Sequence, residues 1–331
     1  MTPVAFDARE TSHMSAGVLN YSRKLREWLP RVAPDVNVIA VGRGDNFDLA
    51  EQVGLPLAIV RSGAKLAHFP TIFVPRFVPG AYVVTVHDLI DLHFPQFVKP
   101  QVAPYVRAFV APVVRKARAV ITDDEATVDD LERFLGVEVR RVRVIPLGTD
   151  DPPEPPAPIE RPRPYVLYVG NRRPHKNLAT LVRAWSELAP ELAVDLVLSG
   201  APEEELRTTR GPGEIVFLGE QSDEQLRRWY AGAAAYAHPA LREGFGLPLL
   251  EAMRNGARVV ATRDAMPGIL AAHAVLVDAY DVAAWRAALT SLLDDPAAAR
   301  SAALAARAAT CELTWERTAR LTAAVYRESA E

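Results

Sequence analysis

The chain is poor in the features that mark secreted and membrane proteins. Cys311 is its single cysteine, which excludes an intrachain disulfide and fits a reducing compartment. No apolar stretch reaches the roughly 18 residues that a membrane-spanning helix needs. The opening residues, MTPVAFDARETS, lack the apolar core of a signal peptide. These absences together predict a cytoplasmic protein.

An excess of charge of either sign is also missing. The 38 lysines and arginines face 41 aspartates and glutamates, for a net charge of -3, so we expect no nucleic-acid partner. The chain contains no Asp-x-Asp metal motif. Its nearest approach, Asp123-Asp124-Glu125, stands at a predicted helix start, where acidic residues are favoured by the helix dipole. We therefore expect no metal site.

What the chain does contain is an alternation of strand and helix patterns on both sides of a proline-rich segment. Residues 151–164, DPPEPPAPIERPRP, have too much proline for a helix or a central strand and form the predicted linker. A length of 331 residues also suggests two domains. We predict two α/β lobes with doubly wound parallel sheets, at residues 1–150 and 165–308, followed by a C-terminal helical segment at 309–331.

Strands are predicted at residues 4–7, 36–41, 65–69, 82–86, 119–122 and 142–146, and again at 165–169, 195–200, 215–219, 231–237, 258–261 and 274–277. The segment 102–120 has a basic, amphipathic pattern that would suit a surface in contact with anionic lipid. A helix that covers a sheet more often explains this pattern, and we prefer that interpretation. Peripheral contact of the first lobe with the inner face of a membrane is kept as the alternative.

The segment 238–256, HPALREGFGLPLLEAMRNG, carries the most specific pattern in the chain. Its glycines predict a tight loop, and a helical pattern begins at Leu247, with Pro248 suited to the first turn. The free N–H groups and the positive dipole end of such a helix bind anions, most often phosphate. Glu243 before the loop and Glu251, expected in the first helical turn, offer carboxylates to sugar and ribose hydroxyls. A capped helix with two solvated glutamates is the alternative, but the whole string favours a nucleotide-sugar pocket.

With GFGLPLLEAM between and around them, Glu243 and Glu251 resemble the E-x7-E motif of retaining GT-B glycosyltransferases of family GT4. The resemblance implies that Glu243 contacts the transferred sugar and Glu251 the ribose of a nucleoside-diphosphate-sugar donor. It implies that sugar and diphosphate are held by the backbone of Gly244, Phe245, Gly246 and Leu247. It also implies a cleft between two Rossmann-like lobes and a C-terminal helix that crosses back to the first lobe.

The resemblance implies further donor-binding residues in the second lobe. Lys176, directly before Asn-Leu, matches the lysine with which the family binds the donor diphosphate. The family often has an arginine directly after the glycine of this loop, where this chain has Asn171, so Arg172 or Arg173 takes that role. A solvated basic loop is the alternative for each arginine but fits Lys176 poorly. Leu218 marks the loop where the family seats the nucleotide base.

Two residues of the first lobe complete the implied site. His87 ends a predicted strand, and parallel α/β sheets bind ligands at such ends. Family members with a V-x-H-D-L segment use this histidine near the transferred sugar, although a histidine bonded into the interface between lobes is a competing interpretation. Gly17 stands where the family's first loop touches the donor phosphate, and a simple turn glycine is the alternative. His68 and His93 are interpreted as structural.

These residues predict a retaining glycosyltransferase that moves a sugar from a nucleoside-diphosphate sugar to a hydroxyl acceptor. Lys176, one arginine and the helix dipole stabilise the departing diphosphate, so that neither a metal nor a cofactor is expected. His87 and Glu243 arrange the sugar. The acceptor is a glycan, a lipid-linked sugar or a small-molecule scaffold. A nucleotide-sugar epimerase on the same fold and a non-catalytic nucleotide-sugar-binding protein are the alternatives.

Overall fold

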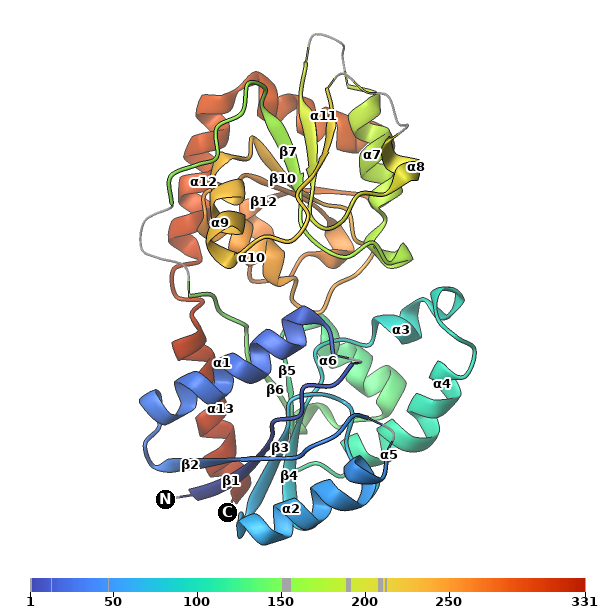
Figure 1. The fold of residues 1–331 in the computed structure, drawn as a ribbon, viewed down its shortest axis with the longest axis vertical. Helices are drawn as coiled ribbons and strands as arrows, with labels where there is room; N and C mark the ends of the chain where they lie inside the picture. Colours follow the sequence, from blue (N-terminus) through green and yellow to red (C-terminus); the bar gives the residue numbers. More distant parts are fainter. Residues whose placement is uncertain are drawn as a thin grey trace. The chain divides into compact units, whose positions relative to one another are not determined.

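The chain folds into two compact units, each built on a parallel sheet (Figure 1). The computed structural model describes residues 2–12, 14–46, 48–150, 156–188, 192–207, 211 and 213–330. The first unit consists of Met1–Gly148 together with Leu313–Glu331, and the second of Thr149–Glu312. Each unit holds a six-stranded sheet. Of the predicted linker, residues 151–155 lie outside the described residues, and residues 156–164 contain neither helix nor strand.

The sheet of the first unit has the strand order β2-β1-β3-β4-β5-β6. Its central strands are buried along their whole length, as parallel strands covered on both faces must be. The order reverses between β1 and β3, and ligands of such sheets bind at the carboxyl ends of the strands beside this switch point. The strands are β1 Thr2–Asp7, β2 Val36–Val41, β3 Leu66–Phe69, β4 Ala81–Thr85, β5 Ala119–Thr122 and β6 Val142–Val144.

Helices cover both faces of the first sheet. The predicted helix at 102–120 runs from α4 through a π-helical turn to α5, ends at Val114 and buries Val106, Val110 and Val113 in the core beneath the sheet. The interpretation as a sheet-covering helix is therefore confirmed. The helical segments are α1 Ala16–Val32, η1 Ala50–Gly54, α2 Leu55–Ser62, α3 Ile90–His93, η2 Pro95–Phe97, α4 Val102–Tyr105, η3 Val106–Val110, α5 Ala111–Val114, α6 Ala126–Asp130, η4 Leu131–Leu135 and η5 Val139–Arg141.

The C-terminal helix α13, Trp315–Ala330, packs back onto the first unit beside α1, which confirms the predicted return of the chain (Figure 1). Its Thr318 hydroxyl donates to the carbonyl of Pro146 at 2.8 Å. A Cβ added at Gly148 would lie 2.0 Å from the carbonyl carbon of Thr314, so a glycine is required where the two pieces of this unit meet. Among the helices of the described residues, none has the length and apolarity to cross a membrane.

The sheet of the second unit has the order β12-β11-β10-β7-β8-β9, and its switch point lies between β7 and β10. Buried side chains of α7 and α11, including Trp185 and Trp285, form the core on one face. The strands are β7 Tyr165–Tyr168, β8 Asp195–Leu198, β9 Ile215–Phe217, β10 Ala235–His238, β11 Val259–Thr262 and β12 Ala274–Val277. The helical segments are η6 Pro174–Lys176, α7 Leu178–Ser186, α8 Glu204–Arg207, α9 Asp223–Gly232, α10 Leu247–Arg254, η7 Arg263–Ala265, η8 Ala271–His273, α11 Val282–Asp294 and α12 Pro296–Ala309.

The strand predicted at 231–237 is wrong at its start. Helix α9 continues to Gly232, and β10 begins only at Ala235. Gly232 serves a close approach at the end of α9, because a Cβ added there would lie 2.5 Å from the carbonyl oxygen of Ile159. The alternation of strands and helices otherwise follows the prediction, and the fold is that of two Rossmann-like units.

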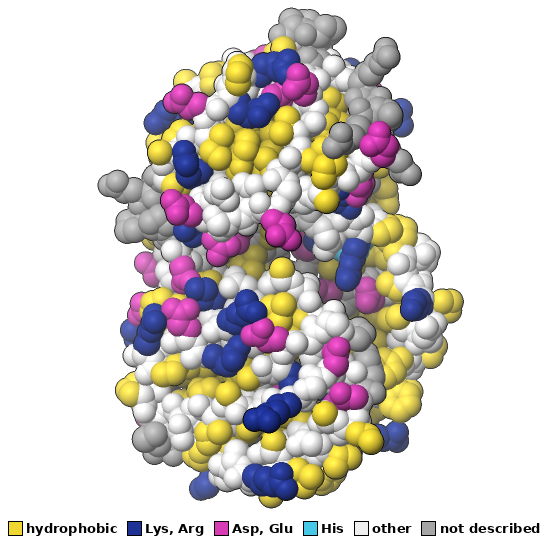
Figure 2. All heavy atoms as spheres, viewed as in Figure 1, with side chains coloured by type: hydrophobic (Ala, Val, Ile, Leu, Met, Phe, Trp, Pro, Cys, Tyr) yellow, Lys and Arg dark blue, Asp and Glu magenta, His cyan; other side chains and the backbone are white. Residues whose placement is uncertain are grey.

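On the face shown in Figure 2, basic and acidic side chains are interspersed over both units rather than gathered by sign. This distribution agrees with the nearly balanced composition, in which net charge is -3.

Candidate active site

The loop between β10 and α10 has the geometry that its glycines predict. Gly246 caps α10 with φ at +70°, a left-handed conformation that favours glycine, and its carbonyl accepts from the N–H of Leu249 at 2.8 Å. Pro248 lies in the first turn of the helix. The N-terminus of α10 therefore opens directly out of the Gly-rich loop, as an anion site requires.

Glu251 does not lie in the first turn of α10, contrary to the prediction. The helix begins at Leu247, which makes Glu251 its fifth residue and places it in the second turn. Its carboxylate is instead approached by the hydroxyl of Tyr230 from α9, at 3.1 Å from Oε2. The helix dipole weakens beyond the first turn, so hydrogen bonding contributes more than the dipole to the environment of this carboxylate.

Glu243 is held by two donors that meet at one of its oxygens. The Nζ of Lys176 donates to Oε1, and Nε2 of His238 lies 2.8 Å from the same atom. The side chains of Lys176 and Glu243 are 13% and 10% exposed. Burial raises the pKa of Glu243, but the charge of Lys176 and the hydrogen bonds from both donors outweigh burial and lower the pKa to about 2. Glu243 is therefore an anion at neutral pH.

The loop after β7 aims Lys176 at this carboxylate. Lys176 ends the short η6 helix, and Asn177 then adopts a left-handed conformation with φ at +51°. Asparagine tolerates that conformation better than most residues, and its amide is anchored on the carbonyl of Ala279 at 2.8 Å. The carbonyl of His175 accepts from the N–H of Leu241 at 2.7 Å and ties the loop after β7 to the loop after β10. Lys176 and Glu243 therefore meet at the switch point of the second sheet.

The two candidate arginines differ in their partners. Arg172 donates to the carbonyl of Ala201 at 2.7 Å, pairs with Glu203 at 2.8 Å and lies over the ring of Phe217. Arg173 is exposed, and no described residue receives a hydrogen bond or ion pair from its guanidinium. Arg172 thus connects the neighbouring loops, whereas the side chain of Arg173 is exposed.

Leu218, Gly244 and Phe245 lie on the expected loops, whereas Gly17 lies in the first turn of a helix and not in a loop or turn, contrary to the prediction. Leu218 follows β9, and its carbonyl accepts from the side-chain amide of Gln221 at 2.7 Å. Gly244 and Phe245 lie between Glu243 and α10, with the Phe245 side chain buried. In the first unit, Gly17 is the second residue of α1 and is exposed.

His87 follows β4 and is bonded through both ring nitrogens. Its Nδ1 lies 2.6 Å from Oδ2 of Asp123, and its Nε2 lies 3.2 Å from the carbonyl oxygen of Pro70. Burial opposes the charged ring, but the carboxylate of Asp123 outweighs burial and raises the pKa of His87. The Pro70 carbonyl can only accept, so Nε2 is the donor in that contact, and the interaction with Asp123 favours the protonated ring.

The role predicted for Asp123 is therefore wrong. Its carboxylate serves His87, while α6 begins at Ala126, whose N–H is accepted by Oδ2 of Asp124 at 3.0 Å. The buried His68 is bonded to the hydroxyls of Tyr326 and Thr85, in keeping with its structural interpretation. Likewise His93 is bonded within the first unit, to Asp130. Among the described residues, no group of three or more His, Cys, Asp or Glu side chains is placed to bind a metal.

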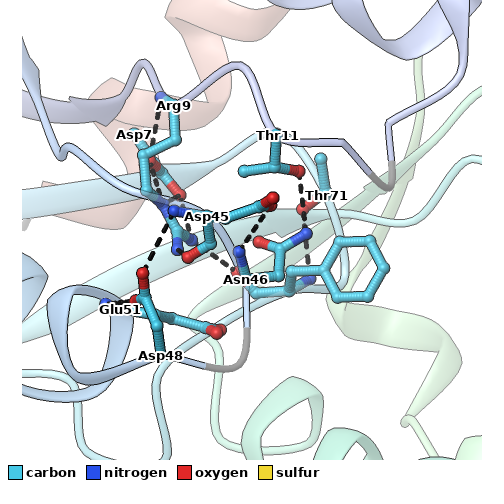
Figure 3. Close-up of polar contacts among 9 residues, drawn as sticks. Asp7, Arg9, Thr11, Asp45, Asn46, Asp48, Glu51 and Thr71 are labelled. Carbon is cyan, nitrogen blue, oxygen red and sulfur yellow. Dashed lines mark hydrogen bonds and ion pairs between the residues drawn. The ribbon is translucent and has the colours of Figure 1, made fainter.

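The carboxyl edge of the first sheet holds a second ion pair, which sequence reasoning missed. Arg9 binds Asp7 through Nε at 2.9 Å and Nη2 at 2.8 Å, and both side chains are 1% exposed. Nη2 also donates to the carbonyl of Phe73 after β3 at 3.1 Å. From the loop after β2, the amide of Asn46 donates to the Thr11 hydroxyl at 2.8 Å beside this pair (Figure 3). The chain's own side chains thus fill the switch point of the first sheet.

Sequence reasoning also missed His238 and Tyr236 on β10. The Tyr236 hydroxyl lies 3.0 Å from Nδ1 of His238, whose other nitrogen reaches Glu243. A polar residue at every second position of an otherwise apolar strand was the available signal, since such residues share one face. A pocket of about 790 Å³ lies at the opposite, amino edge of this sheet, and its lining includes neither Lys176 nor Glu243.

Two family models together match most of the chain. The model described as "Glycosyl transferases group 1" matches residues 163–295, and that described as "Glycosyltransferase Family 4" matches residues 22–152. The O-antigen chain mannosyltransferase B of Escherichia coli is 27% identical over 270 residues, which are 75% of this chain and 70% of that protein. A D-inositol 3-phosphate glycosyltransferase of Salinispora arenicola is 30% identical over 253 residues, 66% of this chain and 56% of that one. The chain thus spans little more than half of this second relative.

Solved structures with the same fold cover the whole chain. Sucrose-phosphate synthase from Thermosynechococcus elongatus has a TM-score of 0.75 at 21% identity, covering 99% of both chains. The glycosyltransferase WaaG, of lipopolysaccharide biosynthesis, has a TM-score of 0.73 at 14% identity, covering 98% of this chain and 99% of that chain. Anabaena HepE, solved with UDP and glucose, has a TM-score of 0.71 at 16% identity, covering 99% of this chain and 100% of that chain. At these identities the likeness concerns the fold, which is GT-B.

Proposed function

The chain belongs to the group 1, family 4 glycosyltransferases, and on that premise we propose that it transfers a sugar from a nucleoside diphosphate to a hydroxyl acceptor with retention of configuration. The observation that carries the proposal is the contact between Lys176 and Glu243 at the switch point of the second sheet. A cation for the diphosphate and a carboxylate for the sugar lie side by side there, and the N-terminus of α10 opens beside Glu243.

The chemical task is to stabilise the charge that grows on the departing diphosphate. Lys176, the exposed Arg173 and the N-terminus of α10 supply positive potential from fixed positions, and prearranged electrostatics of this kind is commonly the largest catalytic contribution. With these cations the transfer needs neither a metal ion nor a cofactor. Arg172 supports the site indirectly, because its guanidinium is engaged with neighbouring backbone and Glu203.

The sugar, the ribose and the base have separate contacts in this proposal. Glu243, ionised and partly exposed, accepts from hydroxyls of the transferred sugar, and Glu251 accepts from the ribose. The backbone around Leu218 receives the base. The amides of residues 244–247 hold the sugar and diphosphate, with Gly17 of the first unit meeting the phosphate.

His87 is proposed to act on the sugar from the first unit. Nε2 of His87 exchanges the Pro70 carbonyl for a sugar hydroxyl and orients it, while the Asp123 carboxylate on Nδ1 favours a protonated ring that attracts the negatively charged diphosphate. The acceptor hydroxyl then attacks the anomeric carbon on the face from which the diphosphate departs. A new C–O bond replaces the bond to the phosphate, and a departing phosphate oxygen takes the hydroxyl proton. The acceptor is a glycan, a lipid-linked sugar or a small-molecule scaffold.

Contact of the first unit with a membrane surface is a separate proposal. Phe77 and Phe109 are 71% and 47% exposed, and the guanidinium of Arg76 lies 5.5 Å from the ring centre of Phe109. Exposed aromatic rings with nearby basic groups suit the interface of an anionic bilayer. Sedimentation with phosphatidylglycerol vesicles tests it: Phe109→Ser together with Phe77→Ser should abolish binding, and equal binding by this variant would contradict the proposal.

A ligand panel tests the donor. UDP, GDP, ADP and their hexose derivatives are added to the protein, and the cognate pair should raise the melting temperature by mass action. Lys176→Ala should remove that increase, whereas Arg183→Ala, an exposed residue of the same unit, should keep it. A panel that leaves the wild type unchanged would contradict the proposal. Incubation of the cognate donor without acceptor, followed by analysis of the sugar, would reveal an epimerase.

A further inference from the structure

Behind Glu243 lies a short series of buried polar side chains on β10. Tyr236 is fully buried and His238 is 2% exposed. Burying such groups costs free energy unless each finds a hydrogen-bond partner. They find these partners in each other and in Glu243, since Nδ1 and Nε2 of His238 lie 3.0 Å from the Tyr236 hydroxyl and 2.8 Å from Oε1 of Glu243.

The partners determine where the ring of His238 carries its proton. Glu243 is ionised and can only accept, so Nε2 of His238 must be the donor in their contact. The Tyr236 hydroxyl lies 3.0 Å from Nδ1 of His238 and 3.3 Å from the carbonyl oxygen of Val169. The hydroxyl therefore holds the Nδ1 side of the ring, while Nε2 donates to Glu243.

Lys176 and His238 share one oxygen of Glu243 but differ in their freedom to move. His238 is the last residue of a fully buried strand. The ammonium group of Lys176, in contrast, is carried by a flexible four-carbon side chain at the end of the short η6 helix. A diphosphate beside Lys176 competes with Glu243 for its ammonium group. When Lys176 turns to the phosphate, His238 is the partner that remains on Glu243.

We propose that His238, supported by Tyr236, is a positioning residue that keeps the Glu243 carboxylate aimed at the donor sugar while Lys176 is drawn to the diphosphate. This inference rests on the proposed function, because it requires Glu243 to contact a sugar. It assigns no contact with the donor to His238 itself. Its effect is therefore on the placement of Glu243 and on turnover, and not on the affinity for a diphosphate that has no sugar.

Three substitutions and one matched control test the inference. His238→Phe removes both hydrogen bonds, His238→Gln keeps a donor near the position of Nε2, and Tyr236→Phe removes only the supporting hydroxyl. The control is His68→Phe in the first unit, which also breaks two hydrogen bonds of a buried histidine but lies among structural contacts. All variants are compared as folded protein, after correction for any unfolded fraction.

We expect His238→Phe to lower kcat with the cognate nucleotide sugar by about 10²-fold, because a misplacement of about 1 Å in a group that positions the substrate causes a loss of this size. Its dissociation constants for UDP, GDP or ADP, whichever binds the wild type, should stay within about threefold. His238→Gln should recover most of kcat, and His68→Phe should leave it unchanged. A His238→Phe variant with unchanged kcat, or one that loses diphosphate affinity and turnover equally, would overturn the inference.

A measurement that needs no activity separates this inference from the proposed function. Ring nitrogen NMR of ¹⁵N-histidine-labelled protein, with His238 assigned from its substitution, should show a proton on Nε2 whose resonance shifts in Glu243→Gln. An unprotonated Nε2, or a resonance insensitive to Glu243, overturns the positioning role even in an active enzyme. A protonated, sensitive Nε2 supports the hydrogen bond even where the ligand panel rejects the proposed donor.

Discussion

Each of the two units has an ion pair at the switch point of its sheet, and the two pairs differ in the solvent exposure of their side chains. In the first unit, Arg9 and Asp7 lie beside the switch point of the sheet with 1% of each side chain exposed. In the second, Lys176 and Glu243 occupy the corresponding position with 13% and 10% exposed. The first pair is closed over by the chain, and the second is within reach of a ligand.

The choice of cation accounts for part of this difference. The planar guanidinium of Arg9 uses several donors at once, on both oxygens of Asp7 and on the carbonyl of Phe73. Lysine offers a point charge on a flexible stem, and Lys176 can exchange one oxygen partner for another with little rearrangement. A multiply bonded arginine thus stabilises a fold, while a lysine at the same place suits a site that must accept and release phosphate.

Arg9→Met should have the largest effect on stability, and it tests whether the first pair is structural. It leaves the Asp7 carboxylate buried without its cation, a change that costs about 3 to 5 kcal/mol of unfolding free energy. Urea denaturation followed by pulse proteolysis, with the fragments of each unit identified by mass spectrometry, measures the loss in the first unit. A loss below about 1 kcal/mol would show that the pair is not needed for the fold.

Lys176→Met makes the matched change in the second unit and should affect turnover rather than stability. Removing a prearranged charge that acts in the transition state lowers kcat by about 10²- to 10³-fold. The free energy of unfolding should change less than in Arg9→Met, because Glu243 is partly exposed and keeps His238 as a partner. Steady-state kinetics measures the change in kcat, and the same urea experiment measures the change in unfolding free energy. A loss of unfolding free energy equal to that of Arg9→Met would show that the two ion pairs do not differ in their structural role.

Acid should weaken the two units in different pH ranges. Burial lowers the pKa of His68 to about 3 from its ordinary 6.5, so between these values the unfolded chain binds a proton that the folded first unit does not. The contribution of His68 to the stability of the first unit therefore falls as the pH decreases from about 6.5 toward 3. The pKa of Glu243 is lowered to about 2 from 4.5, so its contribution to the second unit is lost only below about pH 4.5.

Urea midpoints of each unit at pH 6.5 and 5 measure this order, below the range in which the raised pKa of His87 gives the first unit an opposite dependence on pH. His68→Phe should flatten the dependence of the first unit on pH over that range, because the residue that takes up the proton on unfolding is gone. A second unit that loses stability first, or a first unit whose pH dependence persists in His68→Phe, would contradict the assignment.

The smallest expected effects come from helix caps. Ser222 begins α9 with a complete capping box, in which its hydroxyl accepts from the N–H of Gln225 at 3.2 Å. Ser15 begins α1 with a longer contact of 3.4 Å to Val18. Ser222→Ala should cost about 1 kcal/mol and Ser15→Ala about 0.5 kcal/mol, as measured by unit-resolved urea midpoints. The reverse order would show that the capping box adds nothing here.

Sequence patterns predicted the sheets better than the contacts between side chains. The strands at 36–41, 119–122 and 274–277 are found with the predicted bounds, because runs rich in β-branched residues have few other uses in an α/β fold. The position of Glu251 could have been predicted too, since counting from Leu247 places it in the second turn. The structure of residues 231–234, before β10, could not be predicted, because small residues suit both a helix end and a strand.

Polar pairings between distant residues were beyond the sequence for a physical reason. Lys176 and Glu243 are 67 residues apart, and His87 and Asp123 are 36 apart. Which loops meet depends on the strand order, and a single sequence specifies the residues of each loop without showing their neighbours. The motif therefore identified Glu243 but not its hydrogen bond with His238, although these two residues are only five positions apart in the sequence. The roles of these residues toward a donor stay predictions.

The close approach of Gly148 to Thr314 has a consequence for how the chain can be rebuilt. The second unit is inserted into the first between Gly148 and Leu313, and Gly148 and Thr314, beside the two junctions, lie close together. If residues 149–312 are removed, a peptide of a few residues could join Gly148 to Leu313 without changing the backbone of the first unit. The corresponding segment of another member of the family could be exchanged at the same two junctions while the first unit keeps its own core.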